Sequence, residues 1–122
     1  MAVIINVTPL VLTAADPQRT FNATLANNLT GDITGNFSRD PQASFPAGEV
    51  RQFSLECSYS TDGGANYLEA GGLLWVDAEL DSQKTSGANL YVSIPKTNNR
   101  RLRLVATRIS GNINLVMTIS VN

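Results

Sequence analysis

The side chains with the clearest potential for chemistry are three carboxylates close together in the chain. Asp77, Glu79 and Asp81 alternate with apolar residues, so a strand would place all three on one face. Clustered carboxylates are ligands that Ca²⁺ prefers. Along one strand, however, alternate carboxylates stand about 6–7 Å apart and cannot converge on one ion without ligands from elsewhere. We therefore favour an acidic strand face, or a ladder paired with Arg101 and Arg103, and expect no metal and no cofactor.

The chain has no histidine and a single cysteine, Cys57. The lack of histidine removes the Ser-His-Asp and Cys-His catalytic arrangements and almost all zinc or copper sites. A single cysteine cannot form an internal disulfide. Cys57 lies on the apolar side of an expected strand, without an evident basic neighbour to lower its pKa. We therefore expect Cys57 to pack in the core and the protein not to be an enzyme.

Four arginines form the only basic cluster: Arg100, Arg101, Arg103 and Arg108. Arg101 and Arg103 share one face of an expected strand. A nucleic-acid surface would usually add lysines and exposed aromatic residues, and neither accompanies this cluster. The formal net charge of −1 provides no general attraction to nucleic acid. We expect these arginines to pair within the chain or with a protein partner, and expect no nucleic acid to bind.

Aromatic residues near the strongest turn suggest an alternative binding site. Residues 61–66, Thr-Asp-Gly-Gly-Ala-Asn, combine an aspartate with two glycines that supply positive φ angles. Asp62, Tyr67 and Trp75 together would form a sugar-stacking platform. A single tryptophan beside two glycines is more often an anchor in the core or at a subunit contact.

The composition indicates one globular domain spanning residues 1–122. Apolar residues make up 43% of the chain and charged residues 16%, which excludes a disordered chain and a charged helical rod. No stretch approaches the 18 or more apolar residues of a membrane span, so we expect no membrane contact. The first residues lack a basic region and a long apolar run. We expect the protein to be made in a cytoplasm and not to be exported by a conventional signal on this chain.

The last quarter of the chain has the strongest structural pattern. Leu102, Leu104 and Ala106 alternate with outward positions, and residues 113–121 continue the alternation after a Ser-Gly-Asn break. This pattern predicts a β-hairpin with one buried face, in which Ile113, Leu115, Met117, Ile119 and Val121 point inward.

The first 30 residues are less regular. Residues 3–8 and 10–13 are rich in β-branched side chains and are separated by Pro9. Because proline cannot donate to a sheet ladder, residues 1–15 are expected to form an edge strand or a terminal arm that reaches a neighbouring subunit. Asp16 and Pro17 would suit the start of a helix over residues 17–30. The poor helix residues that follow favour a strand, with Phe21, Ala23 and Leu25 inward.

Further strands are expected at intervals of about 8–12 residues with turn residues between them. They cover residues 33–37, 50–60, 67–69, 73–80 and 90–94, with Leu74, Val76, Ala78 and Leu80 on one face of the fourth. The fold class is therefore all-β, an antiparallel β-sandwich or jelly roll.

Three segments together resemble the small β-sandwich accessory proteins of tailed bacteriophage virions. They are residues 46–49 (PAGE) before a strand, residues 60–67 (STDGGANY) at a hairpin tip, and residues 101–107 (RLRLVAT) before the final strand. The family includes decoration or cement proteins of the capsid and components of the adaptor, collar and tail. The tip sequence also occurs in sugar-binding sandwiches. The resemblance covers residues 49 to the carboxyl end and supplies no functional residues.

The resemblance implies a structural protein of the virion, in the first place a capsid decoration or cement protein. Its partners would be other virion proteins, such as the major capsid protein or tail and portal components, and further copies of itself, as in a trimer. The alternatives are a carbohydrate-binding module or receptor-binding tip, and a tail, collar or adaptor component. The expected contact residues are Val3, Ile4, Ile5, Val7, Trp75, Arg100, Arg101, Arg103 and Arg108.

Overall fold

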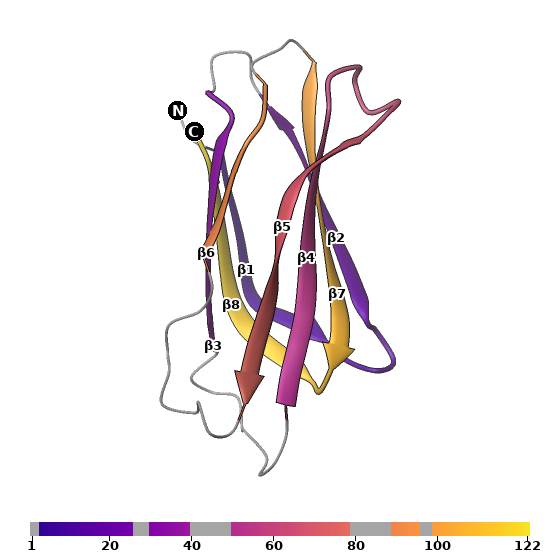
Figure 1. Ribbon diagram of the computed structural model, residues 1–122, viewed down its shortest axis with the longest axis vertical. Coiled ribbons are helices and arrows are strands. Elements are labelled where there is room, and N and C mark those ends of the chain that lie inside the picture. Colours follow the sequence, from indigo (N-terminus) through magenta and orange to yellow (C-terminus); the bar gives the residue numbers. More distant parts are fainter. Residues whose placement is uncertain (1–2, 26–29, 40–49, 79–88, 96–98) are drawn as a thin grey trace.

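A computed structural model describes residues 3–25, 30–39, 50–78, 89–95 and 99–122, and the regular elements in these ranges are all strands (Figure 1). This outcome confirms the all-β prediction, which was based on the alternation of apolar residues along the chain. The eight strands are β1 (Val3–Leu12), β2 (Gln18–Leu25), β3 (Asp32–Arg39), β4 (Val50–Ser60), β5 (Leu68–Ala78), β6 (Asn89–Ser93), β7 (Arg100–Ser110) and β8 (Ile113–Val121).

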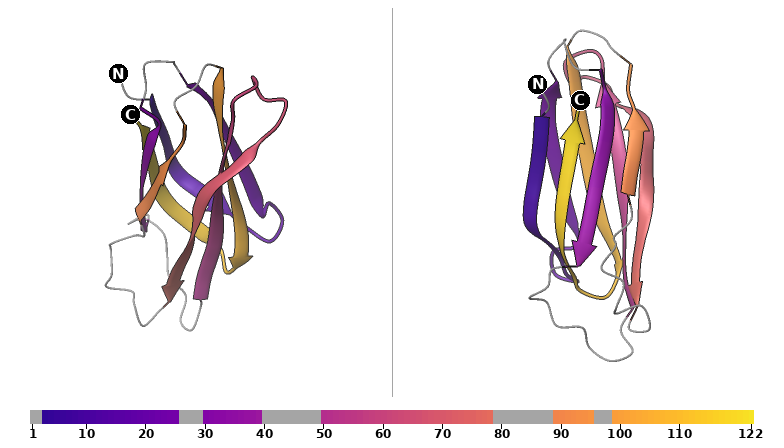
Figure 2. Two further views of the ribbon diagram at one scale, coloured as in Figure 1. Left: turned by 45° about the horizontal axis from the view of Figure 1, so that its top comes forward. Right: turned by 90° about the vertical axis from the view of Figure 1, so that its left-hand side faces the viewer.

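The strands form two four-stranded antiparallel sheets that pack face to face (Figure 2). One has the order β1-β8-β3-β6 and is called the β8 sheet below; the other has the order β2-β7-β4-β5 and is called the β7 sheet. The pairings are nested: β1 with β8, β2 with β7, β3 with β6, and β4 with β5. A long hairpin folded in this way, with its tip between β4 and β5, is a jelly roll. Of the two expected architectures, the strand order therefore matches the jelly roll.

The core lies between the sheets and consists of the inward residues of the strands. In β7, Leu102, Leu104 and Ala106 are fully buried. The inward residues of β8 are buried as the alternation predicted: Ile113, Leu115, Met117, Ile119 and Val121. The register of both central strands is fixed because a shift by one residue would expose these side chains to water.

The predicted hairpin between these two strands is wrong. β7 pairs with β2 and β4, whereas β8 pairs with β1 and β3, so the chain crosses from one sheet to the other at residues 110–112. Gly111 adopts a positive φ of 68° at this crossing. The Nε of Arg108 donates a hydrogen bond to the carbonyl oxygen of Gly111 and holds the connection. Alternation gave the buried face of each strand correctly, but it does not identify the neighbouring strand.

The amino-terminal segment is an edge strand, one of the two expected forms. β1 pairs with β8 only, and its register shifts between Val7 and Leu10. Pro9 falls within this irregularity. Its missing N–H therefore removes no regular hydrogen bond between β1 and β8. The next segment is strand β2, as favoured over a helix, with Leu25 buried and Phe21 and Ala23 packed against the core.

The prediction of two separate strands over residues 67–69 and 73–80 is also wrong. β5 runs continuously from Leu68 to Ala78, with a register irregularity opposite Cys57 and Ser58. An ideal Cβ on Gly72 would lie against the carbonyl oxygen of Leu55, so the backbones approach too closely here for a larger residue. Leu73 and Trp75 face inward, whereas Leu74 is 55% exposed. Within the described ranges, no helix is long and apolar enough to cross a membrane.

The inward and outward positions of β7 make a direct test of this register. Replacing Leu104, which is fully buried, by alanine leaves a cavity between the sheets and is expected to lower the free energy of unfolding by about 2–5 kcal/mol. The adjacent Val105 points outward, and Val105→Ala is expected to cost about 1 kcal/mol or less. Urea unfolding of both variants measures the difference. Equal losses would contradict the assigned register.

Candidate functional site

The tip of the jelly roll is a turn held by its own side chains. Gly63 and Gly64 have φ angles of 75° and 100°, which glycine adopts without strain. The hydroxyl of Ser60 donates to Asp62 over 2.6 Å, and the backbone and side-chain N–H groups of Asn66 donate to the same carboxylate at 2.9 and 2.8 Å. These hydrogen bonds, that of Ser60 first, hold the pKa of the Asp62 carboxyl well below its usual range. Both oxygens of Asp62 therefore serve the turn.

Beside this tip, the ring of Tyr67 is stacked on an arginine of strand β7. The guanidinium carbon of Arg103 lies 4.0 Å from the centre of the Tyr67 ring, a close cation–π contact. Arg101 lies two residues before Arg103, on the same outward face of β7. Its side chain runs past Gly64, where an added Cβ would lie 3.3 Å from the Cδ of Arg101. The two arginines and Tyr67 thus form one surface next to the turn.

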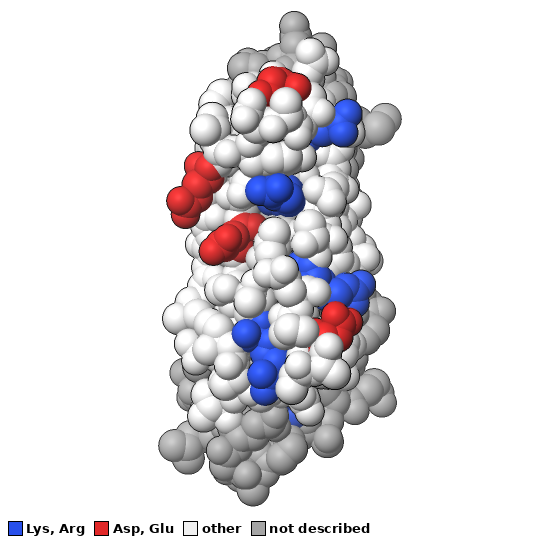
Figure 3. Space-filling model, turned by 90° about the vertical axis from the view of Figure 1, so that its right-hand side faces the viewer, with Lys and Arg blue, Asp and Glu red and all other residues white. Residues whose placement is uncertain are grey.

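A shallow depression of about 140 Å³ opens on this surface. Tyr67 and Arg101 form one side of it, and Asn22, Ala23 and Thr24 of the edge strand β2 form the other. The register explains the arrangement, because Asn22 lies opposite Arg103 and Thr24 lies opposite Arg101. Figure 3 views the outer face of the β7 sheet and shows basic and acidic side chains interspersed over it. That face therefore carries no continuous basic surface of the kind that follows a nucleic-acid backbone.

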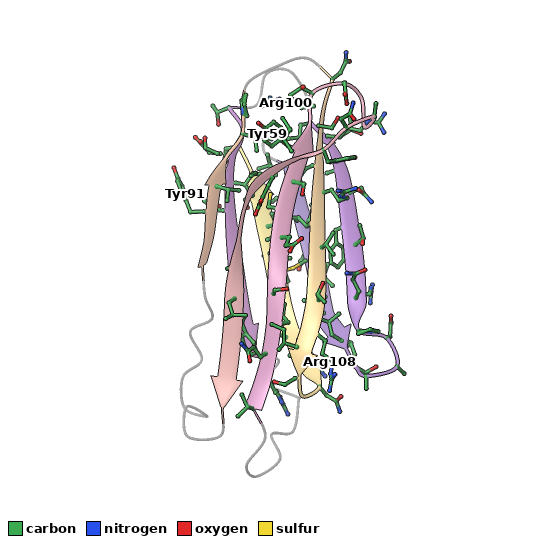
Figure 4. The ribbon with its side chains drawn as sticks, turned by 45° about the vertical axis from the view of Figure 1, so that its right-hand side comes forward. Tyr59, Tyr91, Arg100 and Arg108 are labelled. Carbon is green, nitrogen blue, oxygen red and sulfur yellow. The ribbon has the colours of Figure 1, made fainter. Side chains whose placement is uncertain are left out.

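The predicted arginine cluster does not form one surface. Arg100 shares the inward face of β7 with Leu102, is fully buried, and donates through Nη1 to the carbonyl oxygen of Pro95 at 3.4 Å. Arg108 lies at the opposite end of the sandwich from Arg100 (Figure 4). Only Arg101 and Arg103 come together on the outer face. The inward position of Arg100 could have been predicted from the alternation, because Arg100 falls on the same side of the strand as the buried leucines.

Of the three acidic residues expected on one strand face, the structure describes the backbone of Asp77. Asp77 is placed opposite Arg51 of β4, near the end of the sheet away from Arg101 and Arg103, so the predicted ladder with those two arginines is wrong. Glu79 and Asp81 lie outside the described residues. Among the residues that the structure describes, no group of three potential metal ligands is close enough to hold an ion.

The three residues of the sugar platform inferred from sequence do not meet on one surface. Trp75 is 6% exposed, and its ring centre lies 5.6 Å from that of Phe53 in the core. The indole therefore anchors the core, the more common role of such a residue. Tyr67 is partly exposed, and its ring partner is Arg103. It lines a depression together with residues of β2, which are distant in sequence and were missed.

The outer face of the β8 sheet forms a second candidate surface. Ile4 and Tyr91 are 62% and 72% exposed on its two edge strands. Register places them in one row across the sheet, Ile4 to Ser120 to Thr34 to Tyr91. Of the expected amino-terminal contact residues, Ile5 and Val7 pack against the core, and Val3 lies opposite the inward Val121. Tyr91 was not predicted, although it alternates with Leu90, Val92 and Ile94 and so falls on the other face of that strand.

Comparison with known proteins assigns no family. The chain matches no family model, and no curated protein or solved structure is significantly similar to it. The function proposed for the chain therefore rests on the outer face of the β8 sheet, on the strand order and on the resemblance of short segments.

Cys57 lies in the core, and burial raises the pKa of its thiol to about 11. We predict that a thiol reagent at pH 8 leaves the folded protein unmodified and labels it in denaturant, because only the thiolate reacts. An unfolded cysteine has a pKa near 8.5, so unfolded chains lose the proton first as the pH rises. The free energy of unfolding should therefore fall between about pH 8.5 and 11. Cys57→Ala should show a shallower fall, and rapid labelling of the folded chain would contradict the assignment.

Proposed function

We propose that this protein is a non-enzymatic structural protein that works by contact with further copies of itself and with other proteins. The observation that supports this proposal most strongly is the scarcity of charge on the outer face of the β8 sheet. Strands β1, β6 and β8 contain no aspartate, glutamate, lysine or arginine, and β3 has only Asp32 and Arg39, at its two ends. The charged residues of the described strands lie almost entirely in the β7 sheet.

An uncharged sheet face suits burial in a protein contact, because the centres of interfaces are depleted of charged residues and enriched in aromatic ones. The row from Ile4 to Tyr91 has large apolar side chains at its ends and Ser120 and Thr34 between them. With strands about 4.8 Å apart, the row is about 14 Å long. Serine and threonine form hydrogen bonds without the cost of desolvating a charge.

The occupant that we propose for this face is a second copy of the same chain. A partner must itself present a surface without unpaired charges, since burying such a charge costs several kcal/mol. The outer face of the β8 sheet comes close to that requirement, because its charged residue at the start of β3, Asp32, accepts hydrogen bonds from the hydroxyls of Ser93 and Thr30. β1 borders it with an edge that pairs with no other described strand. Strand addition at this edge would extend the same contact.

For the finer assignment we propose a structural component of a tailed bacteriophage virion, first a capsid decoration or cement protein. The support is the resemblance of residues 46–49, 60–67 and 101–107, together with an eight-stranded jelly roll, an architecture of viral capsid and lectin domains. A fold alone does not assign a function. In such a particle, many copies would bind weakly and gain strength from multivalency.

Substitutions on the β8 sheet test the contact with a second copy. Ile4→Lys and Tyr91→Lys each place a charge on the row, and each is expected to weaken self-association by about tenfold or more. Neither side chain contributes to the core, so the far-ultraviolet spectrum and unfolding midpoint should stay close to those of the original chain. Analytical ultracentrifugation over a range of concentrations measures the association.

Leu74→Lys is the matched control for these variants. Leu74 is 55% exposed like Ile4, but it lies on the β7 sheet, so its replacement should leave self-association unchanged. A chain that stays monomeric at millimolar concentration would contradict the proposal, as would equal weakening by Leu74→Lys.

The virion assignment has a separate test. Purified particles of the phage that encodes the chain should contain it in many copies by quantitative mass spectrometry. Particles assembled without it should take it up from solution and withstand heating better afterwards. Its absence from purified particles would remove the virion assignment while leaving the contact between copies untouched.

A further inference from the structure

The depression beside the jelly-roll tip has one positive charge in its wall, Arg101, and a second, Arg103, next to it on the Tyr67 ring. Arg101 and Arg103 point to the same side of β7. Within the described ranges, neither guanidinium has a carboxylate at ion-pair distance, and the buried Nε of Arg103 has no hydrogen-bond partner. Glu56 and Glu69 lie on the β4 and β5 side of Arg103, across the sheet from the depression. An anion in the depression would therefore meet the guanidinium of Arg101, while the nearby Asp62 carboxylate is occupied by the hydrogen bonds of the turn.

The other side of the depression offers neutral polar groups. Asn22 and Thr24 are exposed on β2, and their side chains make no hydrogen bond to another described residue. An amide has donors and an acceptor, and a threonine hydroxyl can act as either. Such groups suit the hydroxyls of a sugar, whereas a bare anion needs donors only.

The site is also held in shape before any ligand arrives. Stacking on Arg103 at 4.0 Å fixes the Tyr67 ring, and Gly64 leaves room for the Arg101 side chain beside the turn. The hydrogen bonds that Asp62 accepts from Asn66 hold the turn itself in place. A prearranged site loses less conformational entropy on binding.

We propose that this depression binds a carboxylated sugar ring, with Arg101 as the main contact of the carboxylate and Asn22 and Thr24 as contacts of the ring hydroxyls. The cavity of about 140 Å³ is well below the roughly 300 Å³ at which drug-sized pockets begin, so one ring fills it. Guanidinium groups bind carboxylates through charge-assisted hydrogen bonds. The site lies on the β7 sheet, away from the proposed contact face, and does not depend on it.

The test uses the full chain and four probes: glucuronate, glucose, acetate and inorganic phosphate. Titrations followed by amide NMR shifts should show glucuronate binding with millimolar affinity and moving the signals of residues 22–24, 67 and 101. Glucose lacks the carboxylate and acetate lacks the ring, so each should bind at least about tenfold more weakly. Phosphate, which lacks the ring hydroxyls, should also bind more weakly.

Variants assign the two halves of the site. Arg101→Gln should weaken glucuronate by about tenfold or more, whereas Arg19→Gln, an exposed arginine near the other end of β2, should leave it unchanged. Thr24→Val keeps the side-chain shape and removes the hydroxyl, so it should weaken glucuronate several-fold and leave acetate unaffected.

Two results would overturn the proposal. One is that glucuronate does not shift the amide signals of residues 22–24, 67 and 101, or shifts them equally in Arg101→Gln and Arg19→Gln. The other is acetate or phosphate binding as tightly as glucuronate, which would leave an anion site without sugar recognition.

Discussion

The structure depends on the burial of two rows of apolar side chains, one from each central strand, between the two sheets. Leu102, Leu104 and Ala106 belong to one row, and the inward residues of β8 form the other. Both strands have a paired strand on each side, so their inner faces are covered from every direction. The hydrophobic effect fixes which face of each strand is inside. The outer faces remain free of that constraint and can carry function.

The nested pairing around the tip explains why the two candidate surfaces are separate. Pairing of the first strand with the last and of the second with the seventh sends successive strands to opposite sheets, except β4 and β5 at the tip, which share one sheet. Strands that follow one another in the sequence therefore mostly lie on opposite sides of the molecule. Asn22, Tyr67 and Arg101, by contrast, come together from distant segments. A site of this kind has no local motif.

This geometry also decides what the sequence can predict. A period of two residues reports which side of a strand is buried, and it located the strands and the inward residues of β7 and β8. It carries no information about which strand lies alongside, so residues 110–112 suited a hairpin as well as a crossing between sheets. Over residues 73–76 of β5 both alternations are apolar, and the packing of Trp75 against Phe53 shows which of them is inward. Arg100 was predictable from its position in the row of buried leucines, and the Tyr67–Arg103 stack was not.

The two outer faces differ in a way that folding alone does not require. Either face would be compatible with the core if it carried charged residues, and charges on a sheet face and its edge strand guard against unwanted pairing. The β7 sheet has that protection from Glu56, Glu69, Arg101 and Arg103, whereas the β8 sheet lacks it and also exposes Ile4 and Tyr91. Exposed apolar side chains at the edges of an uncharged sheet promote association. A chain that keeps such a face is best explained by a partner that covers it, which leaves the charged face as the side available for a small ligand.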